Sequence, residues 1–256
     1  MFTQAIVCKP SETFNEGLTG VDLGSPDLAL ALNQHAEYCK ALQRCGLQLD
    51  EMPPDPRFPD STFVEDTAVL TGRCAILTHP GARSREGEVH AMRPVLHKHY
   101  ERIYTINPPG TLDGGDICDA DGHFFIGISH RTNEEGAHQL AEILDREGYT
   151  STFVDIRQMS GFLHLKSGIS YLEEGNLLLI DALLDQPAFA AYQRLRVPQE
   201  EAYAANSLRV NDYVLLPAGF PLVGNLVEKL GYEVILLEMS EFQKMDGGLS
   251  CLSLRF

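Results

Sequence analysis

The chain has 256 residues, of which 44% are hydrophobic and 22% charged, so it can bury the core of one large domain or of two small ones. Its formal net charge of −16 argues against nucleic acid and anionic membrane surfaces as partners, and it fits a cationic small ligand or none. The apolar runs are too short to cross a bilayer, and the first residues, MFTQAIVCKP, lack the basic and apolar regions of a signal peptide.

The cysteines predict a reducing environment. None of them forms a CxxC pair or has the Cys/His spacing typical of a zinc site. In a chain of this length they do not suggest a disulfide framework. We therefore expect a cytoplasmic protein whose thiols stay reduced. The six are Cys8, Cys39, Cys45, Cys74, Cys118 and Cys251.

The first elements alternate between strands and helices. Residues 4–8 have the composition of a strand, and Ser25 followed by Pro26 predicts the start of a helix that ends near Gly46. Two apolar runs, roughly 63–70 and 73–78, flank a Thr-Gly turn and predict a hairpin.

Glu65 and Asp66 stand together inside the first run of that hairpin. Neighbouring residues of a strand face opposite sides, so at least one of these carboxylates should point inward. An inward carboxylate is costly unless it is paired or functional.

The rest of the chain repeats the same sequence of elements. A helix is expected at about 84–100 and a strand at 102–106, before a second acidic and glycine-rich stretch that contains Asp113 and Asp116. Further helices should end near Gly148 and span 221–231, and GFLHLKSGISYL (161–172) with NLLLID predicts another pair of strands.

A hairpin, a helix and a strand thus recur about every 45–50 residues, a period typical of a propeller or an array. No low-complexity linker divides the chain. We predict one α/β propeller domain over residues 1–256, with hairpins that point toward a common axis. A doubly wound parallel sheet is the alternative, which the many hairpins disfavour.

Cys251 lies five residues before the end of the chain, in the segment DGGLSCLSLRF. Glycines allow a close backbone approach, and the apolar residues that follow predict a short terminal strand. A thiol on such an anchored loop is a candidate nucleophile. The alternative is that Cys251 is one more small buried apolar residue.

Several polar residues share the property of lying in or beside apolar strand runs. A Cys, a His and two or more carboxylates can form a nucleophilic site in which the thiolate attacks, the His exchanges protons and the carboxylates hold a cation. Singly, each residue could also be structural: Asp116 as a turn cap and His164 as a half-buried histidine. The set is Glu65, Asp66, Asp113, Asp116, His164 and Cys251.

With these residues in view, the sequence resembles the dimethylarginine dimethylaminohydrolase family of the guanidino-modifying, or pentein, superfamily. The resemblance covers essentially the whole chain and implies a five-bladed αβ propeller around a central active-site channel. The motifs that carry it are FPDSTFVEDTAVL (58–70), GARSREGE (81–88), TLDGGDI (111–117), GISHRTNEEGA (127–137), LHLKSG (163–168), AAN (204–206) and DGGLSC (246–251).

The resemblance implies four catalytic residues. Cys251 corresponds to the nucleophile and His164 to the general acid and base. Asp66 and Asp113 correspond to the acidic partners of the guanidinium and of the histidine. Some family members carry Glu where this chain has Asp113. The carboxylate of Asp113 therefore reaches one methylene less far than that of Glu.

It also implies a substrate pocket. Asp60 and Glu65 lie where the family binds the substrate, as does Asp66. Arg85 and Arg131 match the arginines that bind the amino-acid end, which suits an α-carboxylate. The remaining lining comes from the backbone of Leu18 and from Met245, where relatives have a branched aliphatic residue.

The activity so implied is hydrolysis of Nω-methylated arginine to citrulline and an alkylamine, through a covalent S-alkylthiouronium on the cysteine, without a metal or an organic cofactor. The partner expected is this small cationic substrate, with no nucleic acid and no membrane; the oligomeric state is open, a homodimer being one expectation. Two other functions remain open: an arginine deiminase or citrulline hydrolase, and a catalytically silent protein that binds arginine derivatives.

Lys166 bears on the first of these alternatives. Arginine deiminases, which the chain also resembles, carry Asp two residues after the catalytic His, where it accepts hydrogen bonds from an unmodified guanidinium. A dimethylated nitrogen has no N–H to offer such an acceptor. Lys166 at this position therefore predicts a preference for methylated arginines, with its ammonium turned away from the substrate.

Overall fold

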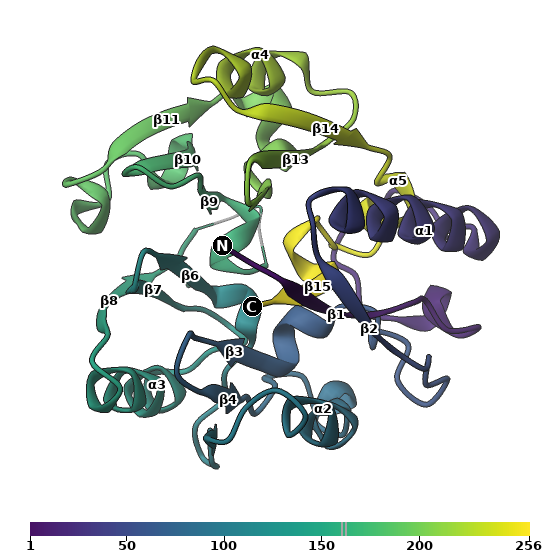
Figure 1. Cartoon of the computed structure of the whole chain (residues 1–256), viewed down its shortest axis with the longest axis vertical. Helices are drawn as coiled ribbons and strands as arrows, with labels where there is room; N and C mark the ends of the chain where they lie inside the picture. Colours follow the sequence, from purple (N-terminus) through teal and green to yellow (C-terminus); the bar gives the residue numbers. More distant parts are fainter. Residues whose placement is uncertain (160, 162) are drawn as a thin grey trace. The chain divides into compact units, whose positions relative to one another are not determined.

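The computed structural model describes residues 1–159, 161 and 163–256. Its strands form five three-stranded sheets, in the orders β15-β1-β2, β3-β4-β5, β6-β7-β8, β11-β10-β9 and β12-β13-β14 (Figure 1). The chain divides into two compact units, one made of Met1–Val64 with Val197–Phe256 and the other of Glu65–Arg196. The expectation of a single catalytic domain over 1–256 stays a prediction.

Four of the sheets share one pattern: an antiparallel pair followed by a parallel third strand. Parallel neighbours need a crossover, and in these four sheets an α-helix supplies it. Between β10 and β11 the crossover contains the 3₁₀ helices η6 and η7. The predicted repeat of hairpin, helix and strand is therefore present.

The first unit contains two of the sheets, and its β15 pairs antiparallel with β1, so the last strand of the chain completes the first sheet (Figure 1). Its elements are β1 (Gln4–Cys8), η1 (Phe14–Glu16), α1 (Leu28–Arg44), β2 (Gln48–Met52), η8 (Gln199–Ala205), β12 (Leu208–Val210), β13 (Tyr213–Pro217), α4 (Pro221–Lys229), β14 (Glu233–Leu237), α5 (Ser240–Gln243), η9 (Ser250–Leu252) and β15 (Ser253–Arg255).

Helix α1 begins two residues later than Ser25-Pro26 predicted. The N-cap is Asp27, whose side chain accepts a hydrogen bond from the Leu30 N–H, and an Asp at this position satisfies a helical donor as well as Ser does. The buried face of α1 includes Tyr38 and Leu42, at the spacing of one helical turn.

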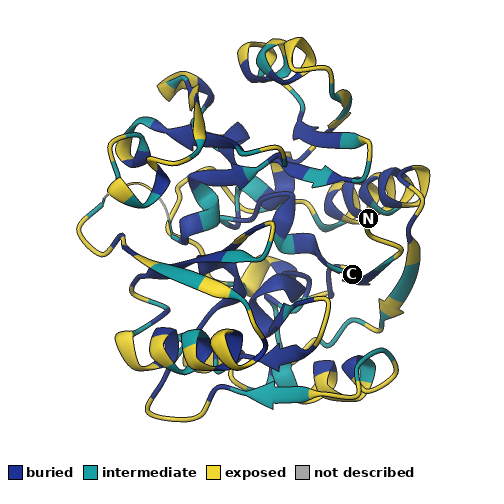
Figure 2. Cartoon of the chain, turned by 60° about the vertical axis from the view of Figure 1, so that its left-hand side comes forward, coloured by how far each residue is buried: buried dark blue, intermediate teal, exposed yellow. Residues whose placement is uncertain are grey.

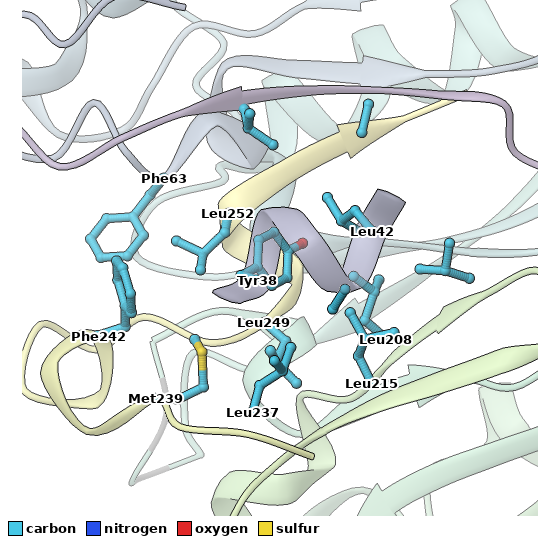
Figure 3. Close-up of a cluster of buried hydrophobic side chains, with 14 of the residues drawn as sticks. Tyr38, Leu42, Phe63, Leu208, Leu215, Leu237, Met239, Phe242, Leu249 and Leu252 are labelled. Carbon is cyan, nitrogen blue, oxygen red and sulfur yellow. The ribbon is translucent and has the colours of Figure 1, made fainter. Parts of the chain in front are cut away.

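The core of the first unit anchors the end of the chain. Tyr38 and Leu42 pack in one cluster with Leu249 and Leu252, which flank Cys251 (Figure 3). Both leucines are 1% exposed or less. Their burial fixes the loop that carries Cys251, and truncation of such a leucine to Ala costs about 2–5 kcal/mol.

The second unit contains the other three sheets, whose middle strands β4, β7 and β10 are largely buried, and its helices are exposed along their outer faces (Figure 2). Its elements, from the turn that joins the two units, are η2 (Val64–Thr67), β3 (Ala68–Leu70), β4 (Ala75–Leu77), η3 (Arg83–Arg85), α2 (Glu88–Leu96), β5 (Ile103–Thr105), η4 (Gly114–Asp116), β6 (Ile117–Ala120), β7 (His123–Ile128), α3 (Glu134–Arg146), β8 (Thr150–Asp155), η5 (Leu165–Ser167), β9 (Ile169–Tyr171), β10 (Asn176–Ile180), η6 (Asp181–Leu183), η7 (Pro187–Phe189) and β11 (Gln193–Val197).

The first strand of the predicted hairpin is shorter than expected, because η2 replaces its N-terminal half. Glu65 and Asp66 lie in this 3₁₀ turn and are 2% and 3% exposed. A turn does not alternate sides as a strand does, so both carboxylates are buried.

The predicted strand at 161–172 is also shorter. Only Ile169–Tyr171 forms β9, and Leu165–Ser167 forms the turn η5 directly after His164. Phe162, which belongs to the same predicted strand, lies outside the described residues. Among the residues that are described, no helix is long and apolar enough to cross a membrane.

Candidate active site

The predicted site residues fall into two groups. Leu18, Asp60, Met245 and Cys251 belong to the first unit, whereas Glu65, Asp66, Arg85, Asp113, Arg131 and His164 belong to the second. The second group forms a buried network of charges.

His164 and Asp113 are bonded to each other. The Nε2–H of His164 donates to Oδ2 of Asp113 at 3.0 Å, since a carboxylate can only accept. The other oxygen of Asp113 accepts from the Gly81 N–H at 2.8 Å. Gly115 makes room for the ring, because a Cβ there would lie 2.8 Å from Nδ1 of His164. This bond keeps a proton on Nε2, so in the neutral ring the free nitrogen is Nδ1.

Asp66 is held from two sides. Its Oδ1 accepts from the Gly115 N–H at 2.9 Å and its Oδ2 from Nη1 of Arg85 at 2.5 Å. Arg85 in turn donates through Nε and Nη2 to Glu88, the first residue of α2. This buried chain of Asp66, Arg85 and Glu88 balances charge inside the unit. Sequence reasoning missed Glu88, although it lies in the GARSREGE motif.

Arg85 therefore differs from Arg131 in its surroundings. The side chain of Arg85 is 5% exposed and engaged by two carboxylates, whereas that of Arg131 is 16% exposed, with Nη1 at 3.6 Å from Oδ2 of Asp113. The predicted binding of a substrate carboxylate by both arginines stays a prediction, and the geometry favours Arg131 for it.

Glu65 is paired with Lys166. The ammonium Nζ lies 2.6 Å from Oε1 of Glu65, and the two side chains are 20% and 3% exposed. The charge of Lys166 is thus directed at a neighbouring carboxylate.

The charges shift the proton affinities of the network. Burial lowers the pKa of His164, but the carboxylates of Asp66, Asp113 and Asp116 outweigh it and raise the value to about 9. Burial raises the pKa of Asp66, yet His164 and Arg85 hold it below its ordinary value. At neutral pH His164 carries a proton and Asp66 a negative charge.

The first unit holds Cys251 on a constrained loop. The Gly248 N–H points at Sγ of Cys251 at 3.4 Å. Asn206 accepts from the Ser250 N–H at 2.9 Å and donates to the Ser250 hydroxyl at 3.2 Å. A Cβ at Gly248 would lie 2.5 Å from Asn206, so this close approach needs glycine. The AAN motif (204–206) was the signal for Asn206, which the sequence analysis did not assign to the site.

Four of the other thiols are unsuited to nucleophilic attack. Burial raises the pKa of Cys39 and of Cys118 to about 12, that of Cys45 to about 11, and that of Cys74 above its ordinary value. A thiol with such a pKa stays protonated at neutral pH. All six cysteines of the described chain are thiols rather than disulfides.

Asp60, Leu18 and Met245 gather at one place in the first unit. The Leu18 N–H donates to Oδ1 of Asp60 at 3.0 Å. A Cβ at Gly17 would lie 2.5 Å from Asp60 and 3.0 Å from Met245, so the three segments approach closely. The side chain of Leu18 is 41% exposed and that of Met245 4%.

Asp66, Asp113 and His164 offer ligand atoms within 4.8 Å of one another, which is a spacing compatible with a metal ion. The oxygens of Asp66 and Asp113 are already used by Arg85, His164 and backbone N–H groups. The guanidinium groups of Arg85 and Arg131 lie against these carboxylates and would repel a metal ion. The arrangement fits proton transfer better than a resident metal.

A cavity of about 280 Å³ lies elsewhere, between α4 and β14, and is lined by Phe220, Pro221 and Leu236 among others. The predicted site residues are not among its lining residues.

Comparison with known proteins now identifies the chain. A family model described as arginine deiminase matches residues 51–214. The N(G),N(G)-dimethylarginine dimethylaminohydrolase of Pseudomonas aeruginosa is 44% identical over the full length of both chains. The chain belongs to the dimethylarginine dimethylaminohydrolase family. A further member, from Streptomyces coelicolor, is 33% identical and aligns with 98% of this chain and 96% of its own.

Solved structures of this dimethylarginine dimethylaminohydrolase family give the same result. The Pseudomonas aeruginosa enzyme, in a cysteine-to-serine variant complexed with citrulline, matches all of both chains with a TM-score of 0.97. A dimethylarginine dimethylaminohydrolase histidine-to-glycine adduct with S-methyl-L-thiocitrulline matches equally well, with 44% identity. The five-bladed αβ propeller of the pentein fold is therefore confirmed. The N-terminal domain of the arginine dihydrolase ArgZ, at 19% identity and a TM-score of 0.88, shares the fold.

Proposed function

We propose that this protein hydrolyses Nω-methylated L-arginine, both asymmetric dimethylarginine and monomethylarginine, to L-citrulline and dimethylamine or methylamine. The observation that carries the proposal is the full-length match, at 44% identity and a TM-score of 0.97, to a dimethylarginine dimethylaminohydrolase that holds citrulline. Citrulline is the ureido product that hydrolysis of a substituted guanidinium would leave.

In the first step Cys251 acts as the nucleophile. Its thiolate attacks the guanidinium carbon, and a carbon–sulfur bond forms while the bond to the alkylated nitrogen breaks. His164 gives its proton to the departing amine, and a cationic S-alkylthiouronium remains on the cysteine. The raised pKa of His164, about 9, supports this role because the acid form is present at neutral pH.

In the second step His164 acts as a base. It takes a proton from water, and the hydroxyl adds to the thiouronium carbon. The carbon–sulfur bond then breaks to release the thiolate, and the added hydroxyl loses its remaining proton to solvent as the C=O of citrulline forms. The bond from Nε2 to Asp113 orients the ring and leaves Nδ1 to exchange the proton in both steps. Asp113 also stabilises the protonated ring.

Asp66 would supply negative charge for the guanidinium, and Glu65, whose charge is paired with Lys166, would line the same part of the pocket. A planar cation with several N–H donors suits carboxylates that are already ionised, and Asp66 is kept ionised by Arg85. At the amino-acid end, Arg131 would bind the α-carboxylate, with Arg85 behind it. Leu18, Asp60 and Met245 would line the remaining wall of the pocket.

The decisive experiment measures citrulline and released amine in parallel with dimethylarginine, monomethylarginine, arginine and agmatine. The proposal expects citrulline and alkylamine from the methylated substrates. Ammonia from arginine at an equal or higher kcat/KM would assign the chain to the deiminases. Binding measured by calorimetry without any ureido product would mean a silent binding protein.

The cellular setting is part of the same proposal. The thiol state of the cysteines fits a reducing, cytoplasmic location, and the small cationic substrate fits the acidic chain. Sedimentation of the purified protein would test the expected homodimer.

A further inference from the structure

We infer that Asp116 is a positioning residue of this site: it fixes Asp113, Arg131 and His164 in one arrangement through hydrogen bonds, without itself touching the substrate. The inference rests on the proposed function for the roles of those three residues. The geometry on which it stands lies entirely within the second unit.

Asp116 accepts three hydrogen bonds, two from the loop after β7 and one from η5. The Ser129 hydroxyl donates to Oδ2 at 2.6 Å and the Thr132 hydroxyl to the same oxygen at 2.7 Å. The Leu165 N–H donates to Oδ1 at 2.9 Å. The carboxylate thus ties η4, the loop after β7 and η5 together.

Each of these donors leads directly to a site residue. The Thr132 oxygen accepts from the Asp113 N–H at 3.1 Å, and the Ser129 oxygen accepts from the Arg131 N–H at 2.9 Å. Leu165 follows His164 in the chain.

The direction of these bonds depends on the charge at position 116. An ionised carboxylate only accepts, so both hydroxyl hydrogens must point at it. The lone pairs of Ser129 and Thr132 are then turned toward the backbone N–H groups. A neutral amide at the same place offers one carbonyl oxygen and an NH₂ group that cannot accept, which would reorganise the network.

The side chain of Asp116 is also buried and tightly packed. Asp116 is 0% exposed. A Cβ at Gly127 would lie 3.0 Å from Oδ1 of Asp116 and 2.9 Å from Leu165. Burial is costly for a carboxylate and raises its pKa to about 6. A residue with only a turn-capping role would not need a charge placed so deeply.

The charge of Asp116 also helps to raise the pKa of His164. The carboxylates that face His164 are Asp66, Asp113 and Asp116, and together they raise its pKa. Arg85 and Arg131 lie against two of these carboxylates, Asp66 and Asp113, and act in the opposite sense. Removing the charge of Asp116 should therefore favour the neutral imidazole.

The test compares Asp116→Asn with Asp119→Asn. Asp119 is exposed, lies three residues later in β6, and accepts from the Gly122 N–H rather than from the site. We expect Asp116→Asn to lower kcat roughly ten- to a hundred-fold, as a small misplacement of catalytic groups does, with a smaller change in KM. Asp119→Asn should keep the wild-type rate.

A second readout does not need activity. The imidazole C–H resonances of His164, followed by NMR across pH, should titrate at lower pH in Asp116→Asn than in the wild type. The titration is independent of the proposed hydrolase function. If the wild type were inactive, the proposed function would be wrong, but the titration would still test the positioning role of Asp116. An unchanged titration together with a wild-type kcat would overturn the inference.

Thr132 provides a pair of variants in case Asp116→Asn does not fold. Thr132→Ser keeps the hydroxyl and should restore the wild-type kcat, whereas Thr132→Val keeps the shape and should lower kcat. Equal rates for the two folded variants would mean that the link from Asp116 to Asp113 has no role.

Discussion

Nζ of Lys166 lies 2.6 Å from Oε1 of Glu65 and joins the turn after His164 to the turn that carries Asp66. The pair places a cation at the position where, by the resemblance to arginine deiminases, an Asp would be expected. Glu65 is consequently balanced within the protein, and one acceptor for an unmodified guanidinium is replaced by a donor. This relationship leads to a prediction about substrate choice.

Wild-type protein should have a higher kcat/KM for dimethylarginine than for arginine. Lys166→Asp should narrow that ratio, because it supplies an acceptor for N–H groups, each of which costs about 1–3 kcal/mol when buried without a partner. Lys166→Met is the matched control, since it removes the charge and releases Glu65 as Lys166→Asp does, but adds no acceptor at position 166. Steady-state kinetics with both substrates measure the ratio. If the wild type uses arginine equally well or better, this account of position 166 is wrong.

Cys251→Ser should keep the fold and abolish turnover, because a hydroxyl is a much weaker nucleophile at neutral pH. His164→Gly should also lose turnover, because it lacks the acid for the departing amine; with S-methyl-L-thiocitrulline, which does not release an amine, its thiolate should still form a covalent adduct. Mass spectrometry of peptides after a substrate quench locates the added mass, which we expect on the peptide of Cys251. An adduct on Cys74 or Cys118 would contradict the assignment.

Arg131→Gln and Arg85→Gln should behave differently. The partly exposed Arg131 should bind the α-carboxylate, so its loss should lower kcat/KM for dimethylarginine by about ten- to a hundred-fold. Agmatine, which lacks the carboxylate, should be a poor substrate for the wild type and little affected by Arg131→Gln. Comparable wild-type rates on agmatine and the methylarginines would exclude the carboxylate clamp.

Loss of the buried Arg85 leaves Asp66 and Glu88 without their shared cation. Arg85→Gln should lower the free energy of unfolding by about 3–5 kcal/mol, measured by urea denaturation. Glu88→Gln separates the structural role of the buried ion pairs from any role of Arg85 in substrate binding. Glu88 binds Arg85 and has no proposed contact with substrate. A large stability loss in both variants is expected, whereas an Arg85→Gln protein with wild-type stability would show that the buried chain is unimportant.

The rate should fall as pH rises through about 9, the raised pKa of His164. The sign follows from the mechanism: the acid form donates to the leaving amine, and it is lost above that pH. Asp113→Asn removes a carboxylate that raises this pKa, so the descending limb of kcat/KM against pH should move to lower pH. A limb that does not move in Asp113→Asn would argue that another group controls it.

His35 should make the protein sensitive to mild acid. Burial in the face of α1 lowers the pKa of His35 from 6.5 to about 4. A backbone hydrogen bond to Cys8 raises this pKa in part, and the charge of Lys9 adds a smaller lowering. The folded state takes up the proton less readily than the unfolded state, so stability is lost as pH falls from about 6.5 to about 4. The full loss is about 3 kcal/mol.

Urea denaturation at several pH values measures this effect. The slope of the unfolding free energy against pH should be smaller in His35→Gln, whereas substitution of the exposed His97 by Gln should leave the slope unchanged. The same slope in the wild type and His35→Gln would assign the acid sensitivity to other groups.

The local sequence determined the repeat of this fold. Strand 4–8 is β1 (Gln4–Cys8), and the helix predicted over 221–231 is α4 (Pro221–Lys229). Alternation, helical periodicity and Gly or Pro signals depend on neighbours a few residues away, and such signals survive folding. The Gly-rich loop before Cys251 was visible for the same reason.

Only the tertiary structure decided which side chains share a charge network. Glu65 and Asp66 are both buried because a turn replaces the expected strand, Arg85 bridges Asp66 and Glu88, and Asp116 accepts hydrogen bonds from two separate segments. Even the pairing of β15 with β1 joins the two ends of the chain. Electrostatic partners in a buried site are chosen by distance and desolvation in the folded state, which local sequence does not encode.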